Sequence, residues 1–113
     1  MRLVDAMPKT AVGRALRNQL VRSGTSVGAN YRAACRGRSK AEFVAKMGIV
    51  VEEADECAFW LELIMDGNLL NRSLVEPLWK EANELTAIFI ASVKTAAQSA
   101  IKNQKSEIKN VRC

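Results

Sequence analysis

The feature that most constrains this chain is a long apolar stripe between residues 39 and 66. Apolar side chains recur there at alternating steps of four and three residues, a spacing that places them on one face of an α-helix. They are Phe43, Met47, Val50, Ala54, Cys57, Leu61 and Ile64. Ser39 and Glu42 form a capping box at the start, and Gly67-Asn68 is a typical helix end. About 27 residues at 1.5 Å each give a rod of roughly 40 Å, which can bury its stripe only against other long helices.

Two further amphipathic segments flank this central helix. Thr10 can cap a helix over residues 11–35, and the glycine-rich residues 24–28 interrupt that helix with poor helix formers. The apolar spacing stays in phase across the interruption, which favours one continuous helix. Ser73, with Glu76 three residues later, is expected to cap a last helix.

The composition favours an all-α protein with one domain. The chain has 113 residues with only two prolines and six glycines, which is enough to bury a core without disulfides or metals. Residues 1–7 form a short amphipathic start. We expect a bundle domain over residues 1–103 and a basic, flexible C-terminal tail over residues 104–113.

Several functional classes are excluded by what the sequence lacks. There is no histidine, and the three cysteines have no metal-ligand spacing, so neither a metal site nor a cofactor is expected. No nucleophile–base pair or phosphate-binding loop is found, so the protein is not expected to be an enzyme. No apolar leader and no run of about 18 apolar residues are present, which predicts a cytoplasmic protein that does not enter a membrane.

Charge is distributed unevenly along the chain. Residues 9–46 carry nine Lys or Arg and one acid, whereas residues 47–84 carry two Lys or Arg and nine acids. One interpretation is that antiparallel helices attract each other along their exposed edges, within one molecule or between subunits. The other is a basic face that binds a polyanion. The candidate nucleic-acid-binding residues are Arg14, Arg17, Arg22, Arg32, Arg36, Arg38 and Lys40.

The central and last helices carry more apolar surface than one partner helix needs. This excess predicts a homo-oligomer, and the alternative is a central helix that is deeply buried within one bundle. The candidate interface residues are Val44, Val51, Phe59, Trp60, Ile88 and Ile90.

The segment Arg22-Ser23-Gly24-Thr25-Ser26, followed by Asn30-Tyr31, resembles the bacterial four helix bundle protein family. Supporting motifs are Ala41-Glu42-Phe43, Glu53-Ala54-Asp55-Glu56, Phe59-Trp60-Leu61 and Glu81-Ala82-Asn83-Glu84-Leu85. The family includes proteins encoded in intervening sequences of large-subunit ribosomal RNA genes and the accessory variability determinant of diversity-generating retroelements. The resemblance covers residues 3–100 and implies an up-down-up-down four-helix bundle that assembles into a homopentamer. Relatives usually carry a longer first helix, so here the first helix is expected to be shortened, or the start codon to be assigned late.

Two functions are compatible with this sequence. The first is a non-enzymatic helical-bundle homo-oligomer that binds RNA or another polyanion through its arginine face, as the retroelement branch of the family implies. Aromatic residues are scarce, so no stacking platform for sequence-specific reading is expected. The alternative is a structural or adaptor oligomer that binds a protein partner, such as a reverse transcriptase, without nucleic-acid contact. In a structure of the assembly, buried arginines paired to Glu52, Glu53 or Glu56 would favour the adaptor, and arginines lining an open surface would favour RNA binding.

Overall fold

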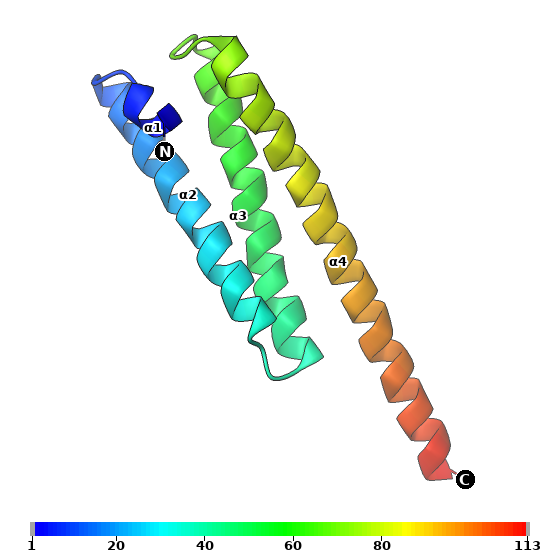
Figure 1. Cartoon of the computed structure of the whole chain (residues 1–113). Helices are drawn as coiled ribbons and strands as arrows, with labels where there is room; N and C mark the ends of the chain where they lie inside the picture. Colours follow the sequence, from blue (N-terminus) through cyan, green and yellow to red (C-terminus); the bar gives the residue numbers. More distant parts are fainter. Residues whose placement is uncertain (1, 113) are drawn as a thin grey trace.

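The computed structural model describes the backbone of residues 2–112 and the side chains of residues 3–99. Within this range the chain is all-α, as predicted, and its first helix is short (Figure 1). The helices are α1 (Arg2–Ala6), α2 (Ala11–Cys35), α3 (Lys40–Asp66) and α4 (Arg72–Arg112). The molecule is elongated, with extents of 67, 20 and 18 Å.

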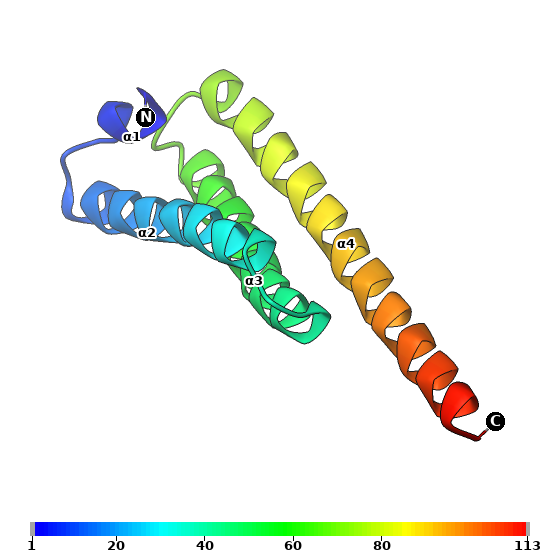
Figure 2. The ribbon, with the colours of Figure 1, turned by 60° about the horizontal axis from the view of Figure 1, so that its bottom comes forward.

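Helix α3 is the centre of the bundle. It runs antiparallel to α2 and α4 and packs against both, whereas α1 packs against the start of α2 (Figures 1 and 2). Helices α2 and α4 therefore lie on two sides of α3, and α4 continues well beyond the ends of its neighbours. This arrangement covers the main stripe of α3 with two long helices.

The buried side chains form two clusters along α3. At the α1 end, Ile64 and Leu61 pack with side chains from all the other helices. This cluster also buries Leu3 and Val4 of α1, together with Met7, which directly follows α1. At the opposite end the second cluster consists of Ala34, Met47 and Val50.

The helix starts follow the capping signals with two differences. The Thr10 hydroxyl accepts a hydrogen bond from the Gly13 amide at 3.1 Å, and the Ser39 hydroxyl accepts one from the Glu42 amide at 3.1 Å. The Glu42 carboxylate reaches one residue further than a capping box requires, because it accepts the Arg38 amide at 2.7 Å. The expected Ser73 cap is wrong, since α4 already begins at Arg72.

Helix α2 continues through residues 24–28, as the in-phase stripe predicted. Polar side chains in and just before this stretch donate hydrogen bonds to backbone carbonyls of α2 and do not end the helix. The Ser23 hydroxyl donates to the Gln19 carbonyl at 2.9 Å, and the Thr25 hydroxyl donates to the Val21 carbonyl at 2.8 Å. Ser23 is fully buried, so this bond satisfies a hydroxyl that has no access to water.

Helix α4 buries only part of its apolar surface against α3. Val75 and Thr86 are buried, whereas Leu78 and Leu85 are each 40% exposed. The reason is that the apolar arc of α4 is wider than one helix contact, and α3 covers only one side of it. The leucines on the other side have no helix over them.

The predictions of a flexible tail and of no membrane span both concern the whole chain, whereas side chains are described only for residues 3–99. Helix α4 runs to Arg112, so the backbone shows no boundary at residue 103, and a flexible tail stays a prediction. Side chains after residue 99 lie outside the described residues. No helix in the described part of the chain has both the length and the hydropathy that a membrane crossing requires.

Candidate nucleic-acid interface

The seven candidate cations separate into three groups along α2 and its end. All seven are exposed. Arg14 and Arg17 lie near the start of α2, Arg22 lies in its middle, and the rest lie at the turn into α3. Arg14 and Arg32 are about 27 Å apart along the helix axis, at 1.5 Å per residue. The candidates are therefore not one compact site.

The turn between α2 and α3 fixes its backbone tightly. The Arg36 amide donates to the Arg32 and Ala33 carbonyls, each at 3.2 Å, which closes the last turn of α2. The Gly37 amide donates to the Ala34 carbonyl at 3.1 Å. A Cβ at Gly37 would lie 3.1 Å from that same oxygen, so the close approach leaves little room for any other residue.

Within residues 3–99, no carboxylate is paired with the side chains at this turn. We call Arg32, Arg36, Arg38 and Lys40 the turn cluster. Among the ion pairs of residues 3–99, none involves a member of this cluster. The Lys40 ammonium hydrogen-bonds the Ser99 hydroxyl of α4, which is a neutral partner, so the positive charge remains uncompensated. Lys46 is a further exposed cation six residues into α3. It belongs to the basic segment over residues 9–46 but was not among the seven candidates.

Arg22 has a different environment from the other six cations. Its guanidinium lies 3.2 Å from a carboxylate oxygen of Glu53, forms an ion pair with Glu56, and donates to the Ser23 hydroxyl at 3.2 Å. The Trp60 indole also donates to Glu56 at 3.2 Å. These contacts join α2 to the acidic edge of α3.

The electrostatics of this network follow from its hydrogen bonds. The bond from Arg22 holds the pKa of the Glu56 carboxyl below its ordinary value, although partial burial opposes this, and the bond from Trp60 lowers the pKa further. The same ion pair raises the pKa of the Arg22 guanidinium. Arg22 is thus held by carboxylates of its own chain, while the turn cluster is not.

The six interface candidates do not form one surface. Val44, Val51 and Trp60 are half-buried, and Phe59 is 49% exposed on the face of α3 opposite Leu61. The Trp60 ring meets that of Phe59 edge-on, with centroids 5.0 Å apart. On α4, Ile88 is 58% exposed and Ile90 is 39% exposed, and a spacing of two residues puts them on opposite sides of the helix. Which of them forms an interface stays a prediction.

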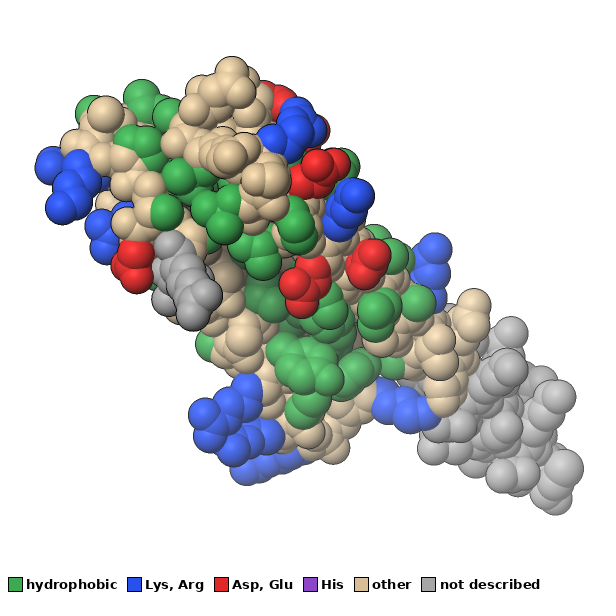
Figure 3. Space-filling model, turned by 45° about the horizontal axis from the view of Figure 1, so that its top comes forward, with side chains coloured by type: hydrophobic (Ala, Val, Ile, Leu, Met, Phe, Trp, Pro, Cys, Tyr) green, Lys and Arg blue, Asp and Glu red, His purple; other side chains and the backbone are tan. Residues whose placement is uncertain are grey.

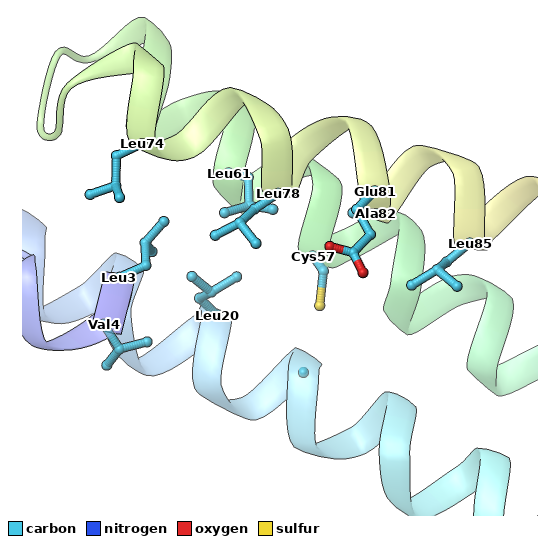
Figure 4. A pocket seen from close by; sticks show the side chains of 11 residues that line it. Leu3, Val4, Leu20, Cys57, Leu61, Leu74, Leu78, Glu81, Ala82 and Leu85 are labelled. Carbon is cyan, nitrogen blue, oxygen red and sulfur yellow. The ribbon is translucent and has the colours of Figure 1, made fainter. Parts of the chain in front are cut away.

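The structure also contains an apolar groove that could not be located from the sequence, because its walls come from residues far apart in the chain. It has a volume of about 460 Å³ and lies between α2 and α4, with α3 as its floor (Figure 4). Helix α1 closes one end of the groove. The lining residues are Leu3, Val4, Leu20, Gly24, Cys57, Leu61, Leu74, Leu78, Glu81, Ala82 and Leu85.

Burial raises the pKa of the Cys57 thiol to about 11, with the nearby Glu53 and Glu56 carboxylates adding to the effect.

The fold and the site define an all-α bundle with an apolar groove and with a basic turn that has no ion-pair partner among residues 3–99. Within the described residues, no group of three His, Cys, Asp or Glu side chains is placed to hold a metal ion. A family model described as 23S rRNA-intervening sequence protein matches residues 1–91, and the chain belongs to this family. This confirms the resemblance seen in the sequence.

One solved structure extends this result to the fold. It is that of a protein with unknown function from the S23 ribosomal protein family of Bacteroides thetaiotaomicron. That protein is 35% identical over 70% of each chain, with a TM-score of 0.66. No curated protein gives a significant match.

Proposed function

We propose that this protein is a non-enzymatic helical-bundle homo-oligomer that binds RNA through the turn cluster. The observation that carries the proposal is the lack of any carboxylate paired with Arg32, Arg36 or Arg38 within residues 3–99. Guanidinium groups that are already paired gain little from a phosphate, whereas unpaired ones can bind it with two parallel hydrogen bonds. Another polyanion with closely spaced phosphates would be bound by the same chemistry.

Such binding is expected to depend on salt and not on base sequence. If four cations each neutralise one phosphate, the logarithm of the association constant falls with the logarithm of salt concentration with a slope of roughly −3. Affinity then drops roughly 60-fold between 50 and 200 mM salt. Tyr31, which directly precedes Arg32, is 46% exposed, but its ring packs against that of Phe89 with centroids 5.8 Å apart, so we do not expect it to serve as a stacking platform for bases.

Repetition in a homo-oligomer would raise the affinity further. Several turn clusters held at fixed distances make the second contact with one RNA an intramolecular event. Arg14 and Arg17 would make a separate and smaller contribution, because they lie about 27 Å and about 22 Å from Arg32, the nearest member of the turn cluster along α2.

The test is a fluorescence anisotropy titration of a structured RNA at 50 and 200 mM salt. The triple variant Arg32→Gln, Arg36→Gln, Arg38→Gln should lose at least tenfold in affinity at 50 mM salt. The matched control Arg14→Gln, Arg17→Gln removes charge from the same helix and should lose less than threefold. The proposal is refuted if the unmodified protein does not bind RNA at 50 mM salt. It is also refuted if the triple variant binds RNA with the same affinity as the unmodified protein.

A second candidate function is an adaptor that binds a protein partner without touching nucleic acid. The observation that favours it is the pairing of Arg22 with Glu53 and Glu56, since this arginine serves the bundle itself. The titration separates the two candidates. An adaptor would show no RNA binding at either salt concentration, and would bind a partner protein, such as a reverse transcriptase, when the two are mixed in pure form.

A further inference from the structure

A second cavity lies where α1, the loop after it and the start of α2 meet. It has a volume of about 380 Å³ and shares only Val4 with the apolar groove. Small-molecule sites in proteins typically have volumes of about 300–1,000 Å³, so the cavity is large enough for one. Its charged lining residues are Asp5, Lys9, Arg14 and Arg17, which give it a formal charge of +2.

The three cations of this cavity are available to a ligand. Arg14 and Arg17 are three residues apart on α2, so they are neighbours on one side of the helix. Both are exposed, as is Lys9, and no ion pair among residues 3–99 involves these cations or Asp5. Figure 3 shows basic side chains and an acidic one close together at the upper left, where α1 and α2 meet, apart from the basic side chains at the turn between α2 and α3.

The walls of the cavity are fixed because the loop packs closely against α2. The Thr10 hydroxyl caps α2 at the Gly13 amide, and a Cβ at Gly13 would lie 2.1 Å from the carbonyl oxygen of Pro8, which lines the cavity. Val4 and Met7 form a buried apolar wall, and the Met7 amide donates to the Val4 carbonyl at 3.3 Å. A cavity with walls already in place loses little conformational entropy when a ligand binds.

The combination of side chains selects the class of ligand. Arginines can hold a phosphate with parallel hydrogen bonds, and the N-terminal end of the α2 dipole also favours an anion. A phosphomonoester carries nearly two negative charges at neutral pH, which matches the formal charge of the lining. The Asp5 carboxylate repels a second anion but accepts hydrogen bonds from hydroxyl groups. The matching ligand therefore has one terminal phosphate and a neutral part that bears hydroxyl groups.

We propose that this cavity binds a nucleoside 5′-monophosphate, with its phosphate at Arg14 and Arg17 and a ribose hydroxyl at Asp5. The base lies against the apolar wall, which a sugar phosphate would leave uncovered. The wall has no aromatic ring, so discrimination between bases is not expected. The nucleotide is either free or the 5′-terminal residue of an RNA, because both carry the same phosphate and ribose. The proposal does not depend on RNA binding by the turn cluster, which lies at the other end of α2.

The experiment is isothermal titration calorimetry of the nuclease-treated full chain with adenosine 5′-monophosphate at low salt. We expect saturable binding with a dissociation constant below about 1 mM. The variant Arg14→Gln, Arg17→Gln should bind at least tenfold more weakly. The matched control Arg36→Gln, Arg38→Gln removes the same charge at the turn cluster and should change the affinity less than threefold. Circular dichroism checks that each variant is folded.

Asp5→Asn separates a nucleotide site from a basic patch. Loss of the carboxylate removes a hydrogen-bond acceptor for the ribose and also removes a negative charge. The variant should therefore bind adenosine 5′-monophosphate at least threefold more weakly and inorganic phosphate more tightly than the unmodified protein. A patch that attracts anions by charge alone would bind both ligands more tightly.

The two sources of the nucleotide are distinguished with one RNA prepared with a 5′-phosphate and with a 5′-hydroxyl. If the ligand is an RNA end, the phosphorylated RNA should bind at least threefold more tightly, and Arg14→Gln, Arg17→Gln should abolish the difference. If the ligand is a free nucleotide, the two RNAs should bind alike while adenosine 5′-monophosphate still binds. The RNA with a 5′-hydroxyl lacks the ligand, so it reports on the turn cluster alone.

Three results would overturn the proposal. The first is no saturable binding of adenosine 5′-monophosphate by the folded protein at low salt. The second is binding that is unchanged in Arg14→Gln, Arg17→Gln. The third is inorganic phosphate bound as tightly as the nucleotide, which would reduce the cavity to a simple anion site.

Discussion

Replacing different glycines by alanine in this protein should have opposite effects on stability. At Gly48, in the middle of α3, an added Cβ meets no atom within 4 Å. Alanine is favoured over glycine in a helix by roughly 0.8–1.0 kcal/mol, so Gly48→Ala should stabilise the fold by about that amount. At Gly13 the added Cβ would lie 2.1 Å from the Pro8 carbonyl oxygen and 3.1 Å from the Thr10 hydroxyl.

The contact at Gly13 cannot be relieved without moving the loop before α2. The backbone of Pro8 has to shift, and this movement pulls on the residue whose hydroxyl caps α2. Overpacking costs about 1–3 kcal/mol, and loss of a helix cap costs about 1 kcal/mol. Together these two costs exceed the gain in helix propensity, so Gly13→Ala should destabilise the fold by roughly 1–3 kcal/mol.

Thermal and urea unfolding followed by circular dichroism will measure both effects. For a chain of this size 1 kcal/mol corresponds to about 4 °C in Tm, so Gly48→Ala should melt about 4 °C higher than the unmodified protein and Gly13→Ala several degrees lower. Protein concentration is kept fixed, because association would also shift the Tm. If Gly13→Ala melts at or above the unmodified protein, the close approach of α2 to the Pro8 carbonyl is wrong.

Three further outcomes are expected. Ile64→Ala removes a fully buried side chain and should cost about 2–5 kcal/mol in urea unfolding, whereas Leu63→Ala, at an exposed neighbour, should cost well under 1 kcal/mol. The pKa of the Glu56 carboxyl is lowered in the folded state, so its ion pair with Arg22 stabilises the fold at pH values above the unfolded-state pKa of 4.5. This stabilisation is lost as the pH falls through the lower folded-state pKa. Glu56→Gln should therefore flatten the pH dependence of stability in that range. Iodoacetamide at pH 8 should label Cys35 faster than Cys57, whose thiol is half-buried and has a pKa of about 11, and peptide mass spectrometry will separate the two sites.

Local signals in the sequence predicted most of the helices. The bounds of α3 follow from Ser39 at its start and Gly67-Asn68 at its end, and Asn68 has a φ of 53°, in the left-handed region typical of a helix end. The continuity of α2 followed from the phase of its stripe. These features depend only on residues within one or two turns of each other, so the sequence contains the information needed to predict them. The Ser73 cap failed because a capping pattern inside a first turn looks the same in sequence as one just before it.

The arrangement of the helices around one another was less predictable. Periodicity showed that α4 has a wide apolar arc, but it does not say which part of the arc meets α3. The buried Val75 and the exposed Leu78 are three residues apart, and both belong to the same wide arc. Only the position of α3 decides between them, and that position depends on contacts between residues far apart in the chain.

Which arginines are paired could not be predicted from the sequence for the same reason. Arg22 and Arg32 lie on the same side of α2 by helical spacing, and nothing in their immediate sequence distinguishes them. In the antiparallel pair of α2 and α3, Arg22 lies level with Glu53 and Glu56, whereas Arg32 lies towards the start of α3, where Lys40 and Lys46 supply more positive charge. An arginine in this bundle is therefore free or paired according to which residues of the antiparallel neighbour lie at its level. This register, more than the number of arginines, leaves the positive charge available at the turn.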